Sequence, residues 1–423
     1  MFDKQLSRRQ VLKAGAAGAA AAALLPIGQA SVSAAGKGRL IPDGKVGTIT
    51  YTQRDVPGRL AISAGSTLTG YLGDPAFPDD ISQLGPLQPL PGGWAELFEF
   101  FNQVGIHQVE FAGYGQNALN PGGTASYSST PEGRANYLDY ASRLRGLLDA
   151  AGLEAIGNHG FIPSTWNGPG SAGGAMSASD LLRFQTELEF GTILGTPFLG
   201  TGSDPTSSSQ IEAWDLACEK WNALNDISVN QFGIHMYPHN HDAAYGFLQD
   251  GPMVTVTVNR QTGLPLLEPI VVRGESGIRK MQYYLDHTDP ALCLVEMDIY
   301  WAYVAQHIHR WRYDWEGNRV EDIFDPLAQV QVQTLRYPLY HAKDGDSTGA
   351  APGVGQGYTM IPFGDPRSDI DYATFFKKHG ERGYHNPNYE QDNAPGSSAT
   401  PEGRGQSLRY TRISATNMND LRG

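Results

Sequence analysis

Short apolar segments alternate with longer amphipathic segments along most of this chain, and this alternation restricts the possible fold more than any other feature. Trp94–Val104 and Ala135–Ala151 carry apolar residues at helical spacing, and each is followed by a glycine, a common residue after a helix end. Short apolar runs typical of buried strands lie between such segments. We predict strands at Leu60–Ser63, Gln108–Ala112, Glu154–Asn158, Pro197–Thr201, Phe232–Pro238, Leu292–Asp298, Pro338–Ala342 and Tyr384–Gln391. We predict further helices at Ser179–Gly195, Ser209–Leu224, Gly277–Asp286, Phe324–Arg336 and Asp371–Gly380.

Eight strands that alternate with helices predict an α/β fold with a closed parallel sheet, a (β/α)8 TIM barrel. A doubly wound open sheet is the alternative. Residues 253–275 interrupt the rhythm, because β-branched residues alternate on either side of Asn259–Gly263. We therefore predict a single barrel domain over residues 35–423, with a hairpin insertion at 253–275 after the fifth strand.

The first 34 residues are typical of a twin-arginine export signal. Arg8 and Arg9 precede an apolar run rich in alanine and glycine, and Val32–Ala34 offers small residues for cleavage. The run from Ala14 to Ala23 is too short to span a membrane. We expect the segment to be removed, and the mature protein to be periplasmic or extracellular without stable membrane insertion.

The composition narrows the choice of partner. Lys and Arg number 31 against 44 Asp and Glu, so the formal net charge is −13, and no basic block follows residue 13. This acidic balance argues against a nucleic-acid partner.

Cys218 and Cys293 lie in apolar surroundings, which predicts two buried free thiols, with a disulfide as the alternative. The composition leaves a homo-oligomer open.

Polar residues able to bind a metal stand at the ends of most predicted strands, where a parallel barrel carries its active site. They are Glu110, His159, His239, His241, Glu296, Asp298, His341, Lys343 and Glu390. Each alone has an ordinary explanation: His341 as a hydrogen-bonded structural residue, for example, or Asp298 as a helix cap. Together, imidazole and carboxylate groups on neighbouring strands predict a divalent site for Mn, Co, Mg or Zn.

Four strings of residues resemble the sugar phosphate isomerase/epimerase family, which has a xylose isomerase-like TIM barrel. They are His239-Asn240-His241-Asp242, Glu296-Met297-Asp298-Ile299-Tyr300-Trp301, His341-Ala342-Lys343-Asp344 and Glu390-Gln391-Asp392. The resemblance runs from about Leu60 to the end of the chain. It implies a metal held by a carboxylate, an Asp, a His and a Glu from strands 5 to 8. Asp298, His341 and Glu390 match the last three.

The chain departs from the family pattern at strand 5, where Ala244 occupies the position of the expected Glu. We predict that His241 supplies the fourth ligand. Asp242, a Glu of the insertion (Glu268 or Glu275) or water are the alternatives. In the family's epimerases the missing Glu and the strand-8 Glu form an acid/base pair, so its loss argues against ordinary two-base epimerisation.

Such a site favours chemistry at a sugar carbonyl. A divalent ion polarises the carbonyl and acidifies the adjacent C–H, and a carboxylate removes that proton to give a metal-stabilised enediolate. We predict Glu390 and Lys343 as catalytic residues. Substrate binding is predicted for Glu110, His159, His239 and Trp301.

We predict a metal-dependent isomerase or epimerase for an unphosphorylated sugar, because phosphorylated sugars are scarce outside the cytoplasm. A lyase or hydrolase acting on keto-glycosides is one alternative, since it shares the first step. A non-catalytic sugar-binding barrel is the other.

Overall fold

The computed structural model describes residues 38–54, 94–114, 127–171, 174–347, 358–396 and 405–423. The chain divides into two compact units, residues 1–34 and 35–423, and the first of them lies outside the described residues. The predicted strand Leu60–Ser63 also lies outside them.

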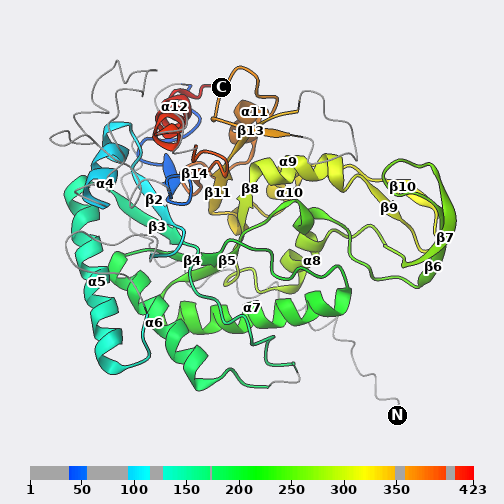
Figure 1. The fold of residues 1–423 in the computed structure, drawn as a ribbon, viewed down its shortest axis with the longest axis horizontal. Coiled ribbons are helices and arrows are strands. Elements are labelled where there is room, and N and C mark those ends of the chain that lie inside the picture. Colours follow the sequence, from blue (N-terminus) through cyan, green and yellow to red (C-terminus); the bar gives the residue numbers. More distant parts are fainter. Residues whose placement is uncertain (1–37, 55–93, 115–126, 172–173, 348–357, 397–404) are drawn as a thin grey trace, which may run out of the picture. The chain divides into compact units, whose positions relative to one another are not determined.

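Parallel strands form the centre of the second unit (Figure 1). The six-stranded sheet has the order β3-β2-β1-β14-β11-β8, and β4 and β5 form a separate parallel pair. The bounds are β1 Gly47–Ile49, β2 Gln108–Phe111, β3 Glu154–Asn158, β4 Phe198–Thr201, β5 His235–Pro238, β8 Glu296–Asp298, β11 Leu339–Ala342 and β14 Asn386–Tyr389. Parallel bridges His159 to Gly200 and His239 to Glu296 join the pair to both edges of the larger sheet. The eight parallel strands therefore follow one another around a ring.

Helices lie outside this ring, and Figure 1 shows α5, α6 and α7 along the side formed by β2 to β5. The helices are α4 Trp94–Gln103, α5 Pro131–Ala151, α6 Ala178–Leu194, α7 Ile211–Phe232, α8 Lys280–His287, α9 Ile299–Ile308, α10 Pro326–Val332, α11 Tyr372–Lys378 and α12 Gln406–Asp420. Thr130 and Ser177 cap the starts of α5 and α6 by accepting backbone N–H groups. Gly152 and Gly195 follow their ends at positive φ, which glycine adopts without strain.

Aromatic side chains fill the space between strands and helices. Trp94 and Phe98 of α4 stack on each other and meet Phe111 of β2 edge-on. The indole of Trp94 donates to the hydroxyl of Tyr140 on α5. All four side chains are buried, so this packing holds the end of β2 in place.

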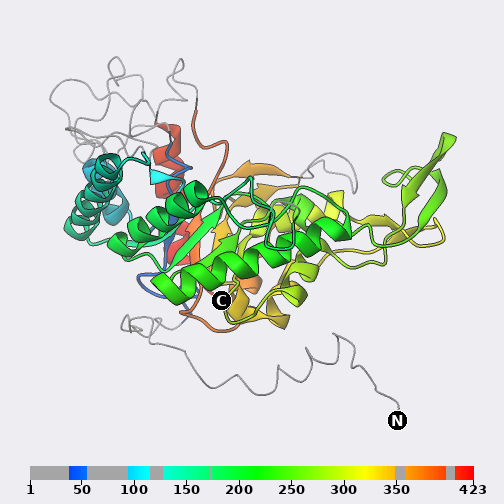
Figure 2. The ribbon, with the colours of Figure 1, turned by 90° about the horizontal axis from the view of Figure 1, so that it is seen from below.

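Three antiparallel ribbons accompany the parallel strands. They are β6 Met253–Val258 with β7 Pro265–Arg273, β9 Trp311–Tyr313 with β10 Arg319–Glu321, and β12 Asp344–Asp346 with β13 Thr359–Ile361. The first two lie side by side, away from the central strands (Figure 2). The Tyr313 hydroxyl donates to the Val258 carbonyl, which ties these two ribbons together. Leu264, Leu267 and Val271 of the first ribbon and its turn are exposed.

The predicted alternation of parallel strands and helices is confirmed. The strand beside β2 in the ring is β1, which the sequence analysis did not predict because it has only three residues within a Gly/Pro-rich segment. Helices α9 and α12 were also not predicted. Cys218 and Cys293 are buried free thiols, as predicted.

Candidate functional site

Charged side chains from β2, β8, β11 and the residues after β3, β5 and β14 meet at the C-terminal ends of the parallel strands. Strand β8 supplies two of them, Glu296 and Asp298, which share one side of the strand because side chains alternate. Both are fully buried.

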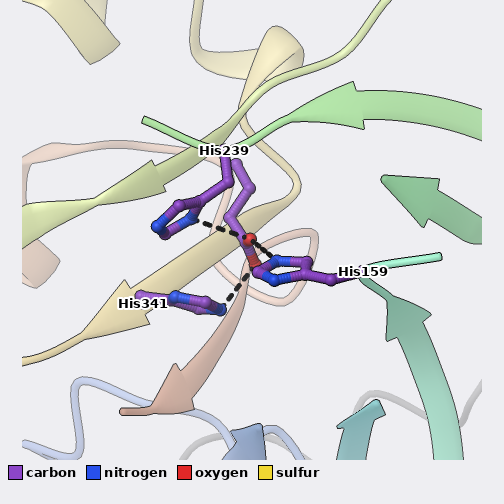
Figure 3. A group of neighbouring side chains, drawn as sticks. His159, His239 and His341 are labelled. Carbon is purple, nitrogen blue, oxygen red and sulfur yellow. Dashed lines mark hydrogen bonds and ion pairs between the residues drawn. The ribbon is translucent and has the colours of Figure 1, made fainter. Parts of the chain in front are cut away.

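In the inner part of this cluster the imidazoles of His159, His239 and His341 point toward one another (Figure 3), around the carboxylate of Glu296. Its Oε2 lies 2.9 Å from Nε2 of His159 and 3.1 Å from Nδ1 of His239. Its Oε1 lies 3.2 Å from Nε2 of His341. Glu110 adds a second carboxylate, whose Oε2 lies 2.9 Å from the same His341 nitrogen. Three imidazoles therefore converge on two buried carboxylates.

The outer part of the cluster contains three further carboxylates and one ammonium group. Nζ of Lys343 lies 2.8 Å from Asp298 Oδ2, 2.8 Å from Glu390 Oε2 and 3.0 Å from Asp392 Oδ2. Asp298 also caps α9, because its Oδ1 accepts the backbone N–H of Trp301. The ring of Trp301 lies 5.5 Å from the same ammonium. Lys343 therefore neutralises part of a dense negative group.

Two histidines stand between the inner and outer parts. His239 presents Nδ1 to Glu296 and Nε2 to Asp298, the latter at 3.8 Å. His341 presents Nε2 to Glu296 and Nδ1 to Glu390, the latter at 2.7 Å. Each ring thus faces an inner carboxylate with one nitrogen and an outer carboxylate with the other.

Two glycines give neighbouring side chains access to Glu110. A Cβ at Gly200 would collide with the ring of Tyr237, whose hydroxyl donates to Glu110. A Cβ at Gly47 would collide with the amide of Asn388, whose Nδ2 donates to Glu110 at 2.9 Å. The absence of a side chain at these two positions allows the inner carboxylate to be fully hydrogen-bonded.

The charges of the cluster shift the pKa values of its members. Burial alone lowers the pKa of His159. The negative charges and hydrogen bonds of Glu110 and Glu296 outweigh burial and raise that pKa to about 9. Burial alone raises the pKa of Glu390, but the charges of Lys343 and His341 outweigh it and hold the pKa well below its usual value. The carboxylate of Glu390 is therefore ionised at neutral pH.

Two overlapping groups of side chains in the described part of the chain have the spacing for a metal ion, and in each the ligand atoms lie within 4.8 Å of one another. The inner group is His159, His239, Glu296 and His341. The outer group is His239, Asp298, His341 and Glu390. Three atoms of the outer group, Asp298 Oδ2, His341 Nδ1 and Glu390 Oε2, are buried and gather around the Lys343 ammonium and one another. Imidazole nitrogens and carboxylate oxygens in this arrangement fit a divalent cation.

Some of the predicted metal ligands belong to these two groups, and others do not. Asp298, His341 and Glu390 lie together, as the family strings imply. His241 belongs to neither group; its ring lies 5.5 Å from Trp301, and its backbone N–H donates to Asp204. Among the alternatives for the fourth ligand, Asp242 pairs with His309, and Glu275 pairs with Arg260.

Sequence reasoning counted Glu296 among the residues able to bind a metal but gave it no specific role, although it lies in one of the diagnostic strings. It also gave none to Asn240, whose buried side-chain amide accepts the N–H of Asp298 and donates to its carbonyl. The two-residue spacing of Glu296 and Asp298 was the available signal, because it places both side chains on one face of the strand.

A cavity of about 1000 Å³ adjoins the cluster at His159. Its wall comes from the residues after β2, β3 and β4 and from helices α5, α6 and α7. Asn158, Arg183, Glu187 and Lys220 are among its polar lining residues.

Comparisons with known proteins agree with this description. The model of the twin-arginine translocation pathway signal sequence matches residues 5–24. A solved sugar phosphate isomerase/epimerase from Parabacteroides distasonis has a TM-score of 0.50 and 17% sequence identity, over 90% of this chain and 96% of that one. The chain shares the fold of that sugar phosphate isomerase/epimerase. No curated protein matches the chain.

Two weaker similarities point to other solved structures. One is the probable 3-DHS dehydratase AsbF from Bacillus anthracis, with a TM-score of 0.46 and 11% identity over 88% of this chain and 98% of that one. The other is an IolI protein with a binding zinc atom, with a TM-score of 0.43 and 10% identity over 89% of this chain and 99% of that one. At these TM-scores the two similarities say nothing more about the chain.

Proposed function

We propose that this chain is an exported, divalent metal-dependent isomerase or epimerase of an unphosphorylated sugar or sugar derivative. Its scaffold would be a (β/α)8 barrel of the xylose isomerase-like type, with the β6–β7 ribbon inserted after the fifth barrel strand. The observation that carries the proposal is the buried group His239, Asp298, His341 and Glu390, whose ligand atoms lie within 4.8 Å of one another.

We assign the metal to the outer group because an inner carboxylate can then accept a hydrogen bond from each metal-bound imidazole. Metal-bound imidazoles commonly donate their second N–H to a carboxylate, which fixes the tautomer and the ring orientation. With the cation on His239 Nε2 and His341 Nδ1, the remaining nitrogens face Glu296. His239 thus takes the ligand position that the sequence analysis gave to His241. Mn, Co, Mg and Zn all fit this donor set.

A bound divalent cation would polarise the carbonyl of a hydroxy-carbonyl sugar and stabilise the negative charge that develops on its oxygens. Glu390 would remove the neighbouring C–H proton through Oε1, since its Oε2 faces His341 and Lys343. Lys343 would supply a proton to one substrate oxygen and take a proton back from the neighbouring oxygen. Glu390 would return its proton to the adjacent carbon, so both residues end as they began. His159 would orient a hydroxyl from the cavity side, and Trp301, whose buried indole N–H lacks a described partner, would bind the sugar.

One observation favours a second candidate, a lyase or hydrolase of keto-glycosides. Ala244, at the position of the expected Glu, is fully buried in the short 3-10 helix Asp242–Tyr245 and offers no carboxylate. A single acid/base residue on one side of the substrate suits expulsion of a β-substituent better than proton return on the opposite face.

Metal analysis of the mature protein tests the proposal. We expect about one equivalent of Mn, Co, Mg or Zn in the wild type, and its loss in Asp298→Ala and His341→Ala. Asp226→Ala and His107→Ala, outside the cluster, should retain the metal. Circular dichroism and the conservative variants Asp298→Asn and His341→Gln distinguish metal loss from misfolding.

The same experiment can overturn the proposal. A folded wild type that holds no metal, and that binds none of the four ions when they are added, would leave a non-catalytic sugar-binding barrel as the better description. Metal binding followed by turnover of keto-glycosides with bond cleavage, and without isomerised sugar, would establish the second candidate.

A further inference from the structure

The cavity beside His159 is larger than one sugar ring requires. Its volume of about 1000 Å³ lies at the upper end of the range for small-molecule sites, roughly 300–1000 Å³. The described residues of the wall run from the end of β2 to helix α7 and belong to the second unit. Helices α5, α6 and α7, which lie outside the ring of strands, contribute side chains to this wall.

The wall contains buried polar atoms with spare hydrogen-bonding capacity. Tyr127 Oη makes no hydrogen bond to any described residue. Tyr114 and Asn158, at most 2% exposed, interact through their side chains, and this contact uses only one of the two N–H groups of Asn158 Nδ2. Buried groups of this kind cost free energy unless water or a ligand pairs with them. Glu187, also buried, accepts the Tyr137 hydroxyl at 3.0 Å through Oε1, which leaves Oε2 for another donor.

Flat apolar surfaces stand beside these polar atoms. Phe161 lies on the wall, with the Arg183 guanidinium 4.0 Å from its ring centroid. Tyr127 faces the same guanidinium at 5.5 Å. Carbohydrate rings bind such surfaces through their C–H faces while their hydroxyls pair with neighbouring amides and carboxylates.

The positive groups of the wall are already engaged by other residues. The Lys220 ammonium donates to the Pro163 carbonyl at 2.7 Å, the Arg183 guanidinium lies over the Phe161 ring, and His159 Nε2 lies 2.9 Å from Glu296. A phosphate group needs several converging donors of positive charge, which this wall does not offer. The cavity therefore favours a neutral, hydroxyl-rich ligand.

His159 connects the cavity to the cluster. Its ring contributes to the cavity wall, and its Nε2 lies 2.9 Å from Glu296 and 3.3 Å from Glu110. A ligand that fills the cavity therefore ends at the His159 ring, whose Nε2 faces the inner carboxylates. A substrate with two sugar units would place one unit at the cluster and the other in the cavity.

We propose that the cavity beyond His159 is a subsite for the second unit of the substrate, so that the substrate is an uncharged glycoside such as a disaccharide rather than a free monosaccharide. This proposal rests on the proposed sugar chemistry of the neighbouring cluster, and it names the substrate class of that site.

Isothermal titration of the mature protein with cellobiose, maltose and lactose, and with glucose and galactose, tests the proposal. We expect at least one disaccharide to bind about tenfold more tightly than its component monosaccharides. Phe161→Ala and Glu187→Gln should each weaken disaccharide binding by about tenfold and leave monosaccharide binding unchanged. Phe232→Ala at the end of α7 and Glu189→Gln on α6, both outside the cavity, are the matched controls.

The outcomes separate this proposal from the metal chemistry. Equal affinity for disaccharides and monosaccharides, or cavity variants that behave as the controls do, would overturn the subsite while the metal content stays intact. Disaccharide binding that depends on the cavity, in a chain that binds no metal, would support the subsite and overturn the metal-dependent function. A chain that binds no saccharide at all would overturn both.

Discussion

Glu296 is the residue on which three imidazoles converge, and it is expected to control the metal without touching it. Glu296→Gln keeps the shape but removes the charge and one of the two acceptor oxygens, so it cannot accept from both His239 and His341. We expect metal affinity to fall by about 10- to 100-fold, as for other groups that orient metal-bound histidines. Competition with a metal-binding indicator measures this change.

A matched variant separates this effect from a general cost of losing a buried charge. Glu275 is equally buried but pairs with Arg260, outside the cluster. Glu275→Gln should leave metal affinity unchanged. If Glu296→Gln binds metal as tightly as the wild type while retaining its circular dichroism spectrum, Glu296 does not orient the ligands.

Glu187 is expected to make stability depend on pH. Burial raises the pKa of Glu187 to about 7, against the hydrogen bond from Tyr137, whereas an unfolded Glu titrates near about 4.3. The folded chain therefore binds the extra proton between these values. The stabilisation that this group provides is fully present below about pH 4 and is lost as the pH rises to about 7, a change of about 4 kcal/mol.

The variant Glu187→Gln should remove this dependence. We expect the free energy of unfolding, measured in urea from pH 4.5 to 8, to fall less steeply for the variant than for the wild type. Glu189→Gln, on the exterior side of the same helix, should follow the wild type. Parallel curves for all three proteins would show that Glu187 is ionised throughout.

The proposed ligand residues illustrate how far single positions can be proposed from sequence. Asp298, His341 and Glu390 could be proposed because each ends an apolar strand within a recognisable string. The choice between His239 and His241 could not be made, because both have the same parity along the chain. His239 continues the strand by bridging to Glu296, whereas the backbone of His241 turns into the 3-10 helix and donates to Asp204.

At the level of elements, the contact between β4 and β5 depends on Gly200. A side chain there would displace Tyr237 from Glu110, so we expect Gly200→Ala to lower the free energy of unfolding by about 1–3 kcal/mol. Gly146, inside α5 with open space around its Cα, is the control. Gly146→Ala should stabilise the chain by about 0.5–1 kcal/mol. Urea unfolding of both variants checks the opposite signs, and a neutral Gly200→Ala would contradict the packing described.

Elements with a complete local signal were predicted to within a few residues, and those without one were missed. Helices α5 and α6 have a capping residue, an amphipathic body and a terminal glycine. Strand β1 has only three residues and depends on its neighbours β2 and β14 for its conformation. Helix α9 follows β8 without a loop and is buried over most of its surface, so its sequence shows no amphipathic period. Tertiary contacts, rather than local preference, determine these elements.

For the whole molecule, the twin-arginine signal predicts the route of export. Lysine preserves the charge of the signal, so Arg8→Lys with Arg9→Lys tests the arginine side chains themselves. We expect the double variant to accumulate uncleaved in the cytoplasm, whereas Lys4→Arg is exported and cleaved as the wild type is. Cell fractionation with mass measurement of the mature N-terminus checks both. Export of the double variant would point to another pathway.

No helix in the described ranges has both the length and the apolar character needed to cross a bilayer. The described second unit presents several exposed apolar side chains on the β6–β7 ribbon, where Leu267 is fully exposed. This ribbon was recognisable from its alternating residues, but its place beside β9 and β10 depends on contacts between residues more than fifty positions apart.

The ring of strands closes at the same residues that are proposed to hold the metal. Between β5 and β8 the backbone bridge joins His239 to Glu296, and the amide of Asn240 pairs with the backbone of Asp298. A cation shared by His239 and Asp298 would therefore span the junction between two strands. Binding of the ion and closure of this junction would then be thermodynamically linked. An ion at a hundred times its Kd would raise the free energy of opening the junction by about 2.7 kcal/mol. Removal of the ion with a chelator would therefore loosen the junction between β5 and β8 before the other strand pairs of the ring.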